Sequence, residues 1–176
     1  LRLFIPDWEG ATIVKEQQKP LTFRVSNLMD VPMKVEVDYQ ILSKDKPVLQ
    51  GKAMSNEALT LKDMYALPSG RYQLKAMVKD EQGNEIEQTV TFTLLSLNDK
   101  RLPEGTGIWC YQPSEEFGAD GTATLYFGSS EKDVYLFYDV MYGDNRMERK
   151  HIVFSDSLMA FRYTYREEYG DGLRCS

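Results

Sequence analysis

Apolar and polar residues alternate with a period of two through much of the chain. This is the pattern of β-strands that turn one face to a core and the other to water. In the first part of the sequence it appears at residues 12–14, 21–25 and 35–41, and a shorter run follows at residues 58–61. Helical periodicity is nearly absent. The pattern therefore predicts an all-β fold made of packed sheets.

A β-hairpin is the most distinct local prediction. Residues 70–78 and 86–94 both alternate, and residues 80–84 between them read Asp-Glu-Gln-Gly-Asn. Gly83 in this turn can adopt a positive φ, which suits a tight connection between two strands.

A polar stretch with proline and glycine at residues 98–105 interrupts the strands, as expected where few contacts cross between domains. We place a boundary there, which gives domains at residues 1–99 and 100–176. Strand patterns then resume at residues 122–127, 134–142, 148–154 and 158–165, with a turn at residues 143–145. The sequence predicts two tandem antiparallel β-sandwiches, and the short second one is open to the interpretation that its last strand is missing.

Both ends of the sequence suggest a piece of a longer protein. It begins with Leu1, and Ser176 directly follows a strand-like segment at residues 173–175. A basic and apolar leader is not found at the N-terminus, so a processed secreted protein and an excised segment both stay open. Cys110 and Cys175 are too few for a zinc site. A disulfide between them and two buried free thiols are both compatible with the sequence, and the second is the preferred interpretation.

Charge and composition exclude some classes of protein. The 176 residues include 21 Lys and Arg against 27 Asp and Glu, a net charge of −6, so a surface that binds nucleic acid is not expected. Hydrophobic residues make up 42% and aromatic residues 12%, which is enough for one or two cores. The longest apolar run, residues 134–141, is interrupted by Asp139 and is too short to span a membrane.

Few residues are candidates for catalysis. A Ser-His-Asp or Cys-His site would need His151, the single histidine, which lies inside a predicted strand without a nucleophile-elbow sequence around it. We interpret it as a solvent-facing or hydrogen-bonded residue. Glu115 with Glu116, and Glu167 with Glu168, point to opposite faces of an extended chain and are interpreted as solvated charge.

Metal and phosphate sites have as little support. Three aspartates lie beside glycines and lack EF-hand spacing, so they are interpreted as turn residues: Asp120, Asp144 and Asp171. Three glycines lie in segments expected to connect strands, not between a strand and a helix: Gly118, Gly121 and Gly128. No catalytic, cofactor-binding or metal-binding residue is assigned, and no cofactor is expected.

Aromatic residues are the most suggestive feature. They cluster in the second half at Tyr135, Phe137, Phe161, Tyr163 and Tyr165. An exposed row of rings could stack on sugars, and with this net charge single-stranded bases are the poorer candidate. Because apolar residues occupy both faces of the segment around residue 136, we expect it to be buried on both sides, with the rings in the core.

The order of short motifs in the second half resembles a macroglobulin-like region of the large bacterial, Bacteroides-type, alpha-2-macroglobulin family proteins. The motifs are Tyr-Phe-Gly-Ser-Ser at residues 126–130, Asp-Val-Tyr-Leu at 133–136 and Tyr-Arg-Glu-Glu-Tyr-Gly-Asp-Gly at 165–172. In the first half, residues 68–74 and 80–83 resemble a hairpin found in macroglobulin-like, fibronectin type III and other secreted sandwiches. The resemblance implies immunoglobulin-like, fibronectin III-like or macroglobulin-like sandwiches throughout residues 20–172.

The resemblance also implies a function. Such proteins entrap proteases when a bait region is cleaved, and some hold a reactive thioester. Neither Cys110, followed by Tyr-Gln-Pro, nor Cys175, followed by Ser176, matches the family's Cys-x-x-Gln motif, and a bait region is not found. Only a structural role is therefore transferred, with other domains of the same long chain and proteases as the expected partners. A periplasmic or cell-surface location follows from the family alone.

Three hypotheses of different classes result. The leading one is a non-catalytic structural and interaction role in an envelope protein. The second is a carbohydrate- or ligand-binding sandwich, in which Trp8 and Trp109 are the residues to test. An enzyme is the least favoured, because one histidine and no clustered ligands leave few ways to assemble an active site.

Overall fold

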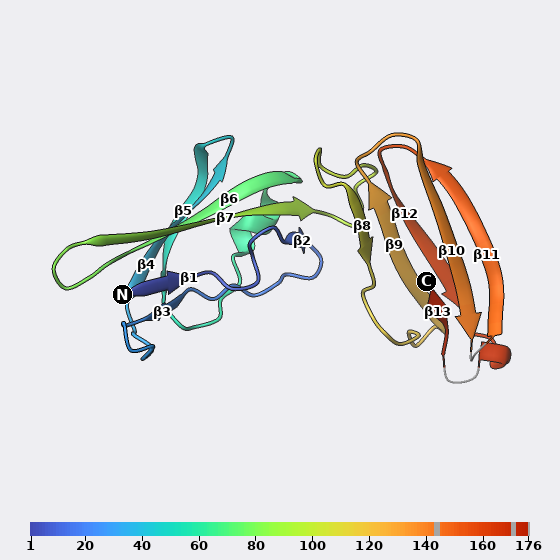
Figure 1. Ribbon diagram of the computed structural model, residues 1–176, viewed down its shortest axis with the longest axis horizontal. Helices are drawn as coiled ribbons and strands as arrows, with labels where there is room; N and C mark the ends of the chain where they lie inside the picture. Colours follow the sequence, from blue (N-terminus) through green and yellow to red (C-terminus); the bar gives the residue numbers. More distant parts are fainter. Residues whose placement is uncertain (143–144, 170–171, 176) are drawn as a thin grey trace. The chain divides into compact units, whose positions relative to one another are not determined.

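Alternating segments of the sequence become antiparallel strands in the computed structural model, which describes residues 1–142, 145–169 and 172–175 (Figure 1). The predicted all-β class is confirmed, and each half of the chain is a β-sandwich. The chain divides into two compact units, Leu1–Leu97 and Asn98–Ser176, called unit 1 and unit 2 below. Within the described residues the helical segments are the short 3₁₀ turns Lys62–Ala66 and Glu167–Tyr169.

Unit 1 contains a five-stranded sheet of order β2-β7-β6-β4-β5 and a two-stranded ribbon, β1-β3. Their bounds are β1 Arg2–Phe4, β2 Thr12–Val14, β3 Arg24–Ser26, β4 Glu36–Ser43, β5 Lys46–Met54, β6 Gly70–Lys79 and β7 Glu85–Leu95. The pairing of β2 with β7 is parallel, whereas the other pairs of the sheet are antiparallel.

The predicted hairpin is the β6–β7 pair, which runs in register from Gly70 opposite Leu94 to Lys79 opposite Glu85. Gly83 has φ +82° in its turn, as expected. Along β6 every second side chain is buried, from Tyr72 to Val78, and the residues between them face solvent or are half-buried. The sheet therefore has one core face and one polar face.

The core of unit 1 lies between the sheet and the β1–β3 ribbon. Trp8 packs edge-on against Phe92 with ring centroids 5.3 Å apart, and Tyr72 stacks on Phe92 at 5.9 Å. Leu3 of β1 and Val25 of β3 belong to the same buried cluster. Because Trp8 is only 1% exposed, the expectation that it could contact a ligand is wrong: the indole supports the core instead.

Unit 2 is a sandwich of two three-stranded sheets, β12-β9-β8 and β11-β10-β13. The bounds are β8 Ile108–Tyr111, β9 Thr122–Ser129, β10 Val134–Tyr142, β11 Asn145–Phe154, β12 Ser157–Thr164 and β13 Arg174–Cys175. Rings from the two sheets meet between them: Phe127 packs on Phe154 at 5.3 Å and Tyr138 on Phe161 at 5.4 Å.

Some strands differ from the predictions. β1, β5 and β8 were not predicted, and residues 58–61 are not a strand, since only Leu59 forms a bridge, to Leu21.

Gly128 lies inside β9, so the expectation that it lies in a segment connecting two strands is wrong. A Cβ there would be 2.9 Å from the Leu102 side chain, so the missing side chain lets Leu102 cover the strand. The strands around the turn predicted at residues 143–145 pair as expected, but Gly143 and Asp144 lie outside the described residues.

Candidate interaction surfaces

The outer face of the β10–β11 hairpin carries a group of exposed apolar and aromatic side chains. Tyr135 is 68% exposed, Phe137 67% and Val153 54%. Tyr135 lies opposite Val153 in the ladder, and Phe137 lies opposite His151, with ring centroids 6.0 Å apart. We call these four residues the aromatic face.

The expectation that this segment is buried on both sides is wrong. Leu136 and Tyr138 point inward, and Tyr138 meets Phe161 of the facing sheet. Their neighbours Tyr135 and Phe137 then point outward, because successive strand residues alternate. Within the described residues of unit 2, the second sheet covers only the inner side of β10, so a run that is apolar on both faces leaves one apolar face in water.

An ion pair marks one border of the aromatic face. Asp139 and Arg149 are two positions along the ladder from Phe137 and His151, and so form the next pair on the same face. The Arg149 guanidinium donates from Nε and from one terminal nitrogen to the two Asp139 carboxylate oxygens, at 2.8 and 3.1 Å. The hydrogen bond with Asp139, together with its charge, raises the pKa of Arg149 above its usual value.

A second aromatic cluster lies on the outer face of the other sheet of unit 2. Trp109 and Tyr111 of β8 are stacked, with centroids 5.6 Å apart and planes 8° from parallel. Tyr126 of β9 pairs with Tyr111 in the ladder, and their rings are 6.4 Å apart. All three side chains are half-buried, so Trp109 is accessible in part, as the ligand-binding hypothesis expected.

Unit 1 has an exposed apolar turn that sequence reasoning missed. Leu28 is 74% exposed and Met29 81%, and the loop that carries them is ordered by Asn27. The Asn27 side-chain oxygen accepts hydrogen bonds from the amides of Met29 and Val31, at 2.9 and 3.0 Å. The sequence did contain a signal for this exposed turn. Leu28 and Met29 lie between Asn27 and Asp30, and asparagine and aspartate favour turns.

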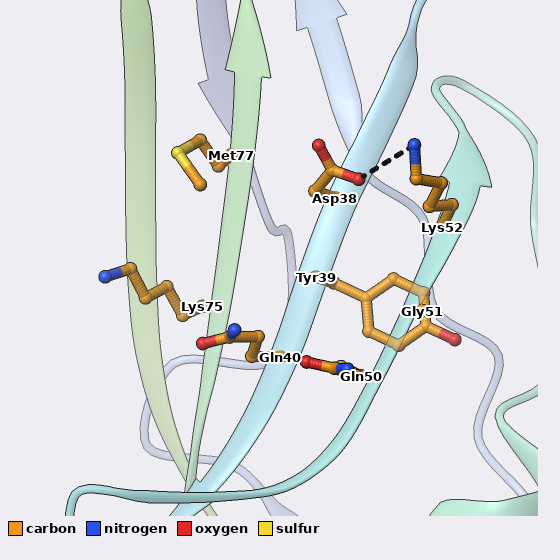
Figure 2. A pocket seen from close by; sticks show the side chains of 8 residues that line it. All are labelled: Asp38, Tyr39, Gln40, Gln50, Gly51, Lys52, Lys75 and Met77. Atoms are coloured by element: carbon orange, nitrogen blue, oxygen red, sulfur yellow. Dashed lines mark ion pairs between the residues drawn. The ribbon is translucent and has the colours of Figure 1, made fainter.

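The polar face of the unit 1 sheet is shallowly hollowed where β4, β5 and β6 lie side by side (Figure 2). The hollow measures about 480 Å³, and its two lysines are engaged by carboxylates. Lys52 contacts Glu36 at 2.7 Å and Asp38 at 3.5 Å, and Lys75 contacts Glu87 at 3.1 Å. Because both lysines are already paired with carboxylates, the hollow offers little net positive charge to an anion.

Both cysteines are free thiols in the structure, as the preferred interpretation had it, but they are exposed, so the expected burial is wrong. They line one cavity of about 520 Å³ in unit 2, together with Leu125, Tyr163 and residues of the loop at 112–117.

The other members of the predicted aromatic cluster lie on or just after β12. Phe161 and Tyr163 are half-buried on the inner side of this strand, and Tyr165 is 45% exposed.

The residues considered for catalysis stay apart. His151 is exposed on β11, as expected, and the four glutamates at positions 115, 116, 167 and 168 are exposed too. Across residues 1–142, 145–169 and 172–175, no group of three or more His, Cys, Asp or Glu side chains is placed to hold a metal ion. Within the same residues, every buried side-chain nitrogen or oxygen has a hydrogen-bond partner.

Asp120 is a turn residue, as predicted. Its carboxylate accepts from the Thr122 amide at 3.0 Å and from the Thr122 hydroxyl at 2.7 Å, and these bonds lower its pKa. Asp144 and Asp171 lie outside the described residues.

Comparisons with known proteins give fold-level matches only. No protein-family model and no curated protein matches the sequence. One matching structure is a tetra-tandem repeat in the extending region of a large adhesion protein, at 12% identity and TM-score 0.38, covering 90% of this chain and 39% of that one. Another, the fibronectin(III)-like modules of CbhA from Clostridium thermocellum, matches at 9% identity and TM-score 0.39, covering 94% of this chain and 80% of that one. Both TM-scores lie below 0.5, so neither match decides the function of this chain.

The part of the chain that the structure describes contains no helix long and apolar enough to cross a membrane.

Proposed function

We propose that the chain is a pair of non-catalytic β-sandwich modules that act through surface contacts inside a larger cell-envelope protein. The aromatic face of β10–β11 is the observation that carries the proposal. Three large apolar side chains on two paired strands are each more than half exposed, and a contiguous apolar group of this kind marks an interaction site more often than a solvated surface.

The shape and chemistry of the aromatic face favour a folded protein as the occupant. It lies on two paired strands, and none of its four residues lines one of the hollows described above. Tyrosine and phenylalanine are enriched at the centres of protein interfaces, and charged groups lie at their rims. The Asp139–Arg149 pair is placed as such a rim group. The occupant we propose is another domain of the same long chain.

Site-specific cross-linking in the full-length protein tests this contact. A photo-reactive phenylalanine analogue in place of Phe137 is expected to cross-link within the chain to a domain outside residues 98–176. The matched control carries the analogue in place of Val48, an exposed residue of the edge strand β5. Equal yields at the two positions, no cross-link at all, or cross-links only to glycan would refute the proposal.

The finer proposal, from the family resemblance, is a macroglobulin-type protease-trapping scaffold in the periplasm or at the cell surface. A protease added to the full-length protein should then stay bound and cleave small peptides while losing activity on large substrates. Loss of activity on both, or on neither, would leave the structural role without the trapping role.

Ligand binding is the second candidate, favoured by the parallel Trp109–Tyr111 stack on the outer face of β8. Because Trp8 is buried in unit 1, a Trp8→Phe variant leaves Trp109 as the single fluorescent indole. A saturable change of its emission with one member of a glycan panel, abolished by Tyr111→Ala, would support a sugar platform. Constant emission across the panel would reject it.

A further inference from the structure

The two cysteines of unit 2 come from strands that occupy corresponding edges of its two sheets. Cys110 lies on β8, the edge of the sheet β12-β9-β8, and Cys175 lies on β13, the edge of the sheet β11-β10-β13. Their ladder partners are Phe127 on β9 and Val140 on β10. Although 65 positions separate them in the sequence, both thiols line the same cavity.

The partly enclosed environment of the two thiols disfavours their ionised forms. Burial raises the pKa of Cys175 above its usual range, a hydrogen bond with Tyr163 opposes this, and the charge of Cys110 raises it further. Burial also raises the pKa of Cys110. A raised pKa argues against an activated nucleophile at either cysteine. The proximity of the two thiols rests on the cavity that both of them line.

Strand β13 is a short edge strand. Its pairing with β10 comprises two residue pairs, Val140 with Cys175 and Met141 with Arg174. Two ladder positions attach an edge strand only weakly. A covalent link to the opposite sheet would therefore stabilise the attachment of β13 to the sandwich.

We propose that Cys110 and Cys175 form a disulfide that links the two sheets of unit 2 when the protein meets an oxidising environment. With a small-molecule disulfide such as oxidised glutathione, the thiolate of one cysteine attacks a glutathione sulfur, which forms a mixed disulfide and releases one reduced glutathione. The second cysteine, deprotonated by solvent, then attacks the mixed disulfide and releases a second reduced glutathione. The bridge depends on the geometry of unit 2 alone and not on the proposed function.

The test begins with the reduced full chain, equilibrated with mixtures of oxidised and reduced glutathione. The expected product is a monomer that has lost two hydrogens, has no thiol accessible to maleimide in denaturant, and yields a linked Cys110–Cys175 peptide on non-reducing digestion. Because the bridge closes a long loop, the melting temperature of unit 2 should rise by roughly 10 °C.

The single variants Cys110→Ser and Cys175→Ser are the matched controls. Each should instead carry one glutathione and show no rise in melting temperature, which demonstrates that the remaining thiol is accessible. Wild-type protein that carries two glutathiones, forms only intermolecular dimers, or links its cysteines only in denaturant would overturn the proposal.

Discussion

Both units are built from strands in which apolar and polar residues alternate, but they differ in how completely their apolar side chains are buried. All of the largest side chains with less than 2% exposure lie in unit 1, among them Trp8, Phe23 and Phe92. In unit 2, the facing rings of Phe161 and Tyr163 are only half-buried, and a cavity opens between the sheets. Unit 1 therefore encloses its core with its own residues. Unit 2 leaves apolar side chains accessible both in the cavity between its sheets and on its outer, aromatic face. This difference is the reason why the proposal places the interacting surface on unit 2.

Matched leucine truncations should show the largest effect. Leu74, on the central strand β6, is fully buried, whereas Leu125, on the central strand β9, lines the cavity of unit 2. Leu74→Ala should cost about 4 kcal/mol, because it opens a closed cavity in a dense core. Leu125→Ala should cost about 1–2 kcal/mol, because it enlarges a space that already exists.

Each unit has one tryptophan, so its unfolding can be followed separately. In variants with Trp109→Phe or Trp8→Phe, urea denaturation monitored by the remaining indole reports unit 1 or unit 2, respectively. Equal losses for the two leucines would remove the contrast between the units.

Buried serines give the next comparison. The Ser55 hydroxyl donates to the Met33 carbonyl at 2.6 Å and accepts from the Val35 amide at 2.9 Å. The Ser129 hydroxyl accepts from the Glu131 amide at 3.1 Å. Ser55→Ala should therefore cost about 2 kcal/mol and Ser129→Ala about 1 kcal/mol. The same single-tryptophan denaturation checks both, and Ser→Thr variants at each site show whether the hydroxyl is the group that matters.

Turn glycines should behave alike in the two units. Gly83 has φ +82° and Gly121 has φ +73°, and a Cβ at either position would meet nothing within 4 Å. Gly83→Val and Gly121→Val should each cost on the order of 1 kcal/mol or more, from backbone strain alone. Thermal melts of the two variants measure it. An unchanged melting temperature at one site would mean that this turn relaxes into another conformation.

Turn carboxylates should give the smallest effect. Hydrogen bonds, chiefly from the Asn84 side chain, lower the pKa of Asp80 below 3.8, and the Thr122 side chain does the same for Asp120. A lowered folded-state pKa stabilises the fold above the unfolded-state value, and this contribution is lost as the pH falls below 3.8 through the folded value. In Asp80→Asn and Asp120→Asn, melting temperature should therefore decline less on acidification than in wild type. If the melting temperature of the variants fell as steeply as that of the wild type, these two carboxylates would make no contribution to the acid sensitivity of the fold.

Sequence reasoning recovered the regular strands well, because alternation is a local signal. The β6–β7 hairpin and β10–β12 follow directly from it. β5 was missed because Pro47 and Gly51 interrupt the pattern, and an edge strand paired on one side tolerates both. β8, with four residues after a glycine-containing loop, offers too short a pattern to detect.

The candidate surfaces were harder to predict, because exposure depends on what covers a sheet. An apolar run on both faces of β10 is typical of a strand between two layers. Whether a second layer exists is a tertiary property, and here Phe137 meets none within the described residues of unit 2. The shared cavity of Cys110 and Cys175 likewise results from sheet order, which spacing along the chain does not encode.

The parallel pairing of β2 with β7 has a mechanical consequence for unit 1. β7 ends at Leu95, opposite Val14, and just beyond it the Leu97 amide donates to the Glu16 carboxylate at 3.1 Å. A pulling force that enters the unit through Leu97 runs along the β2–β7 ladder, so its hydrogen bonds are loaded in shear and must break together rather than in sequence. Single-molecule stretching of wild type and Glu16→Gln measures this directly, and an equal rupture force would locate the resistance elsewhere. We therefore expect this strand pair to let unit 1 resist tension that is applied through Leu97.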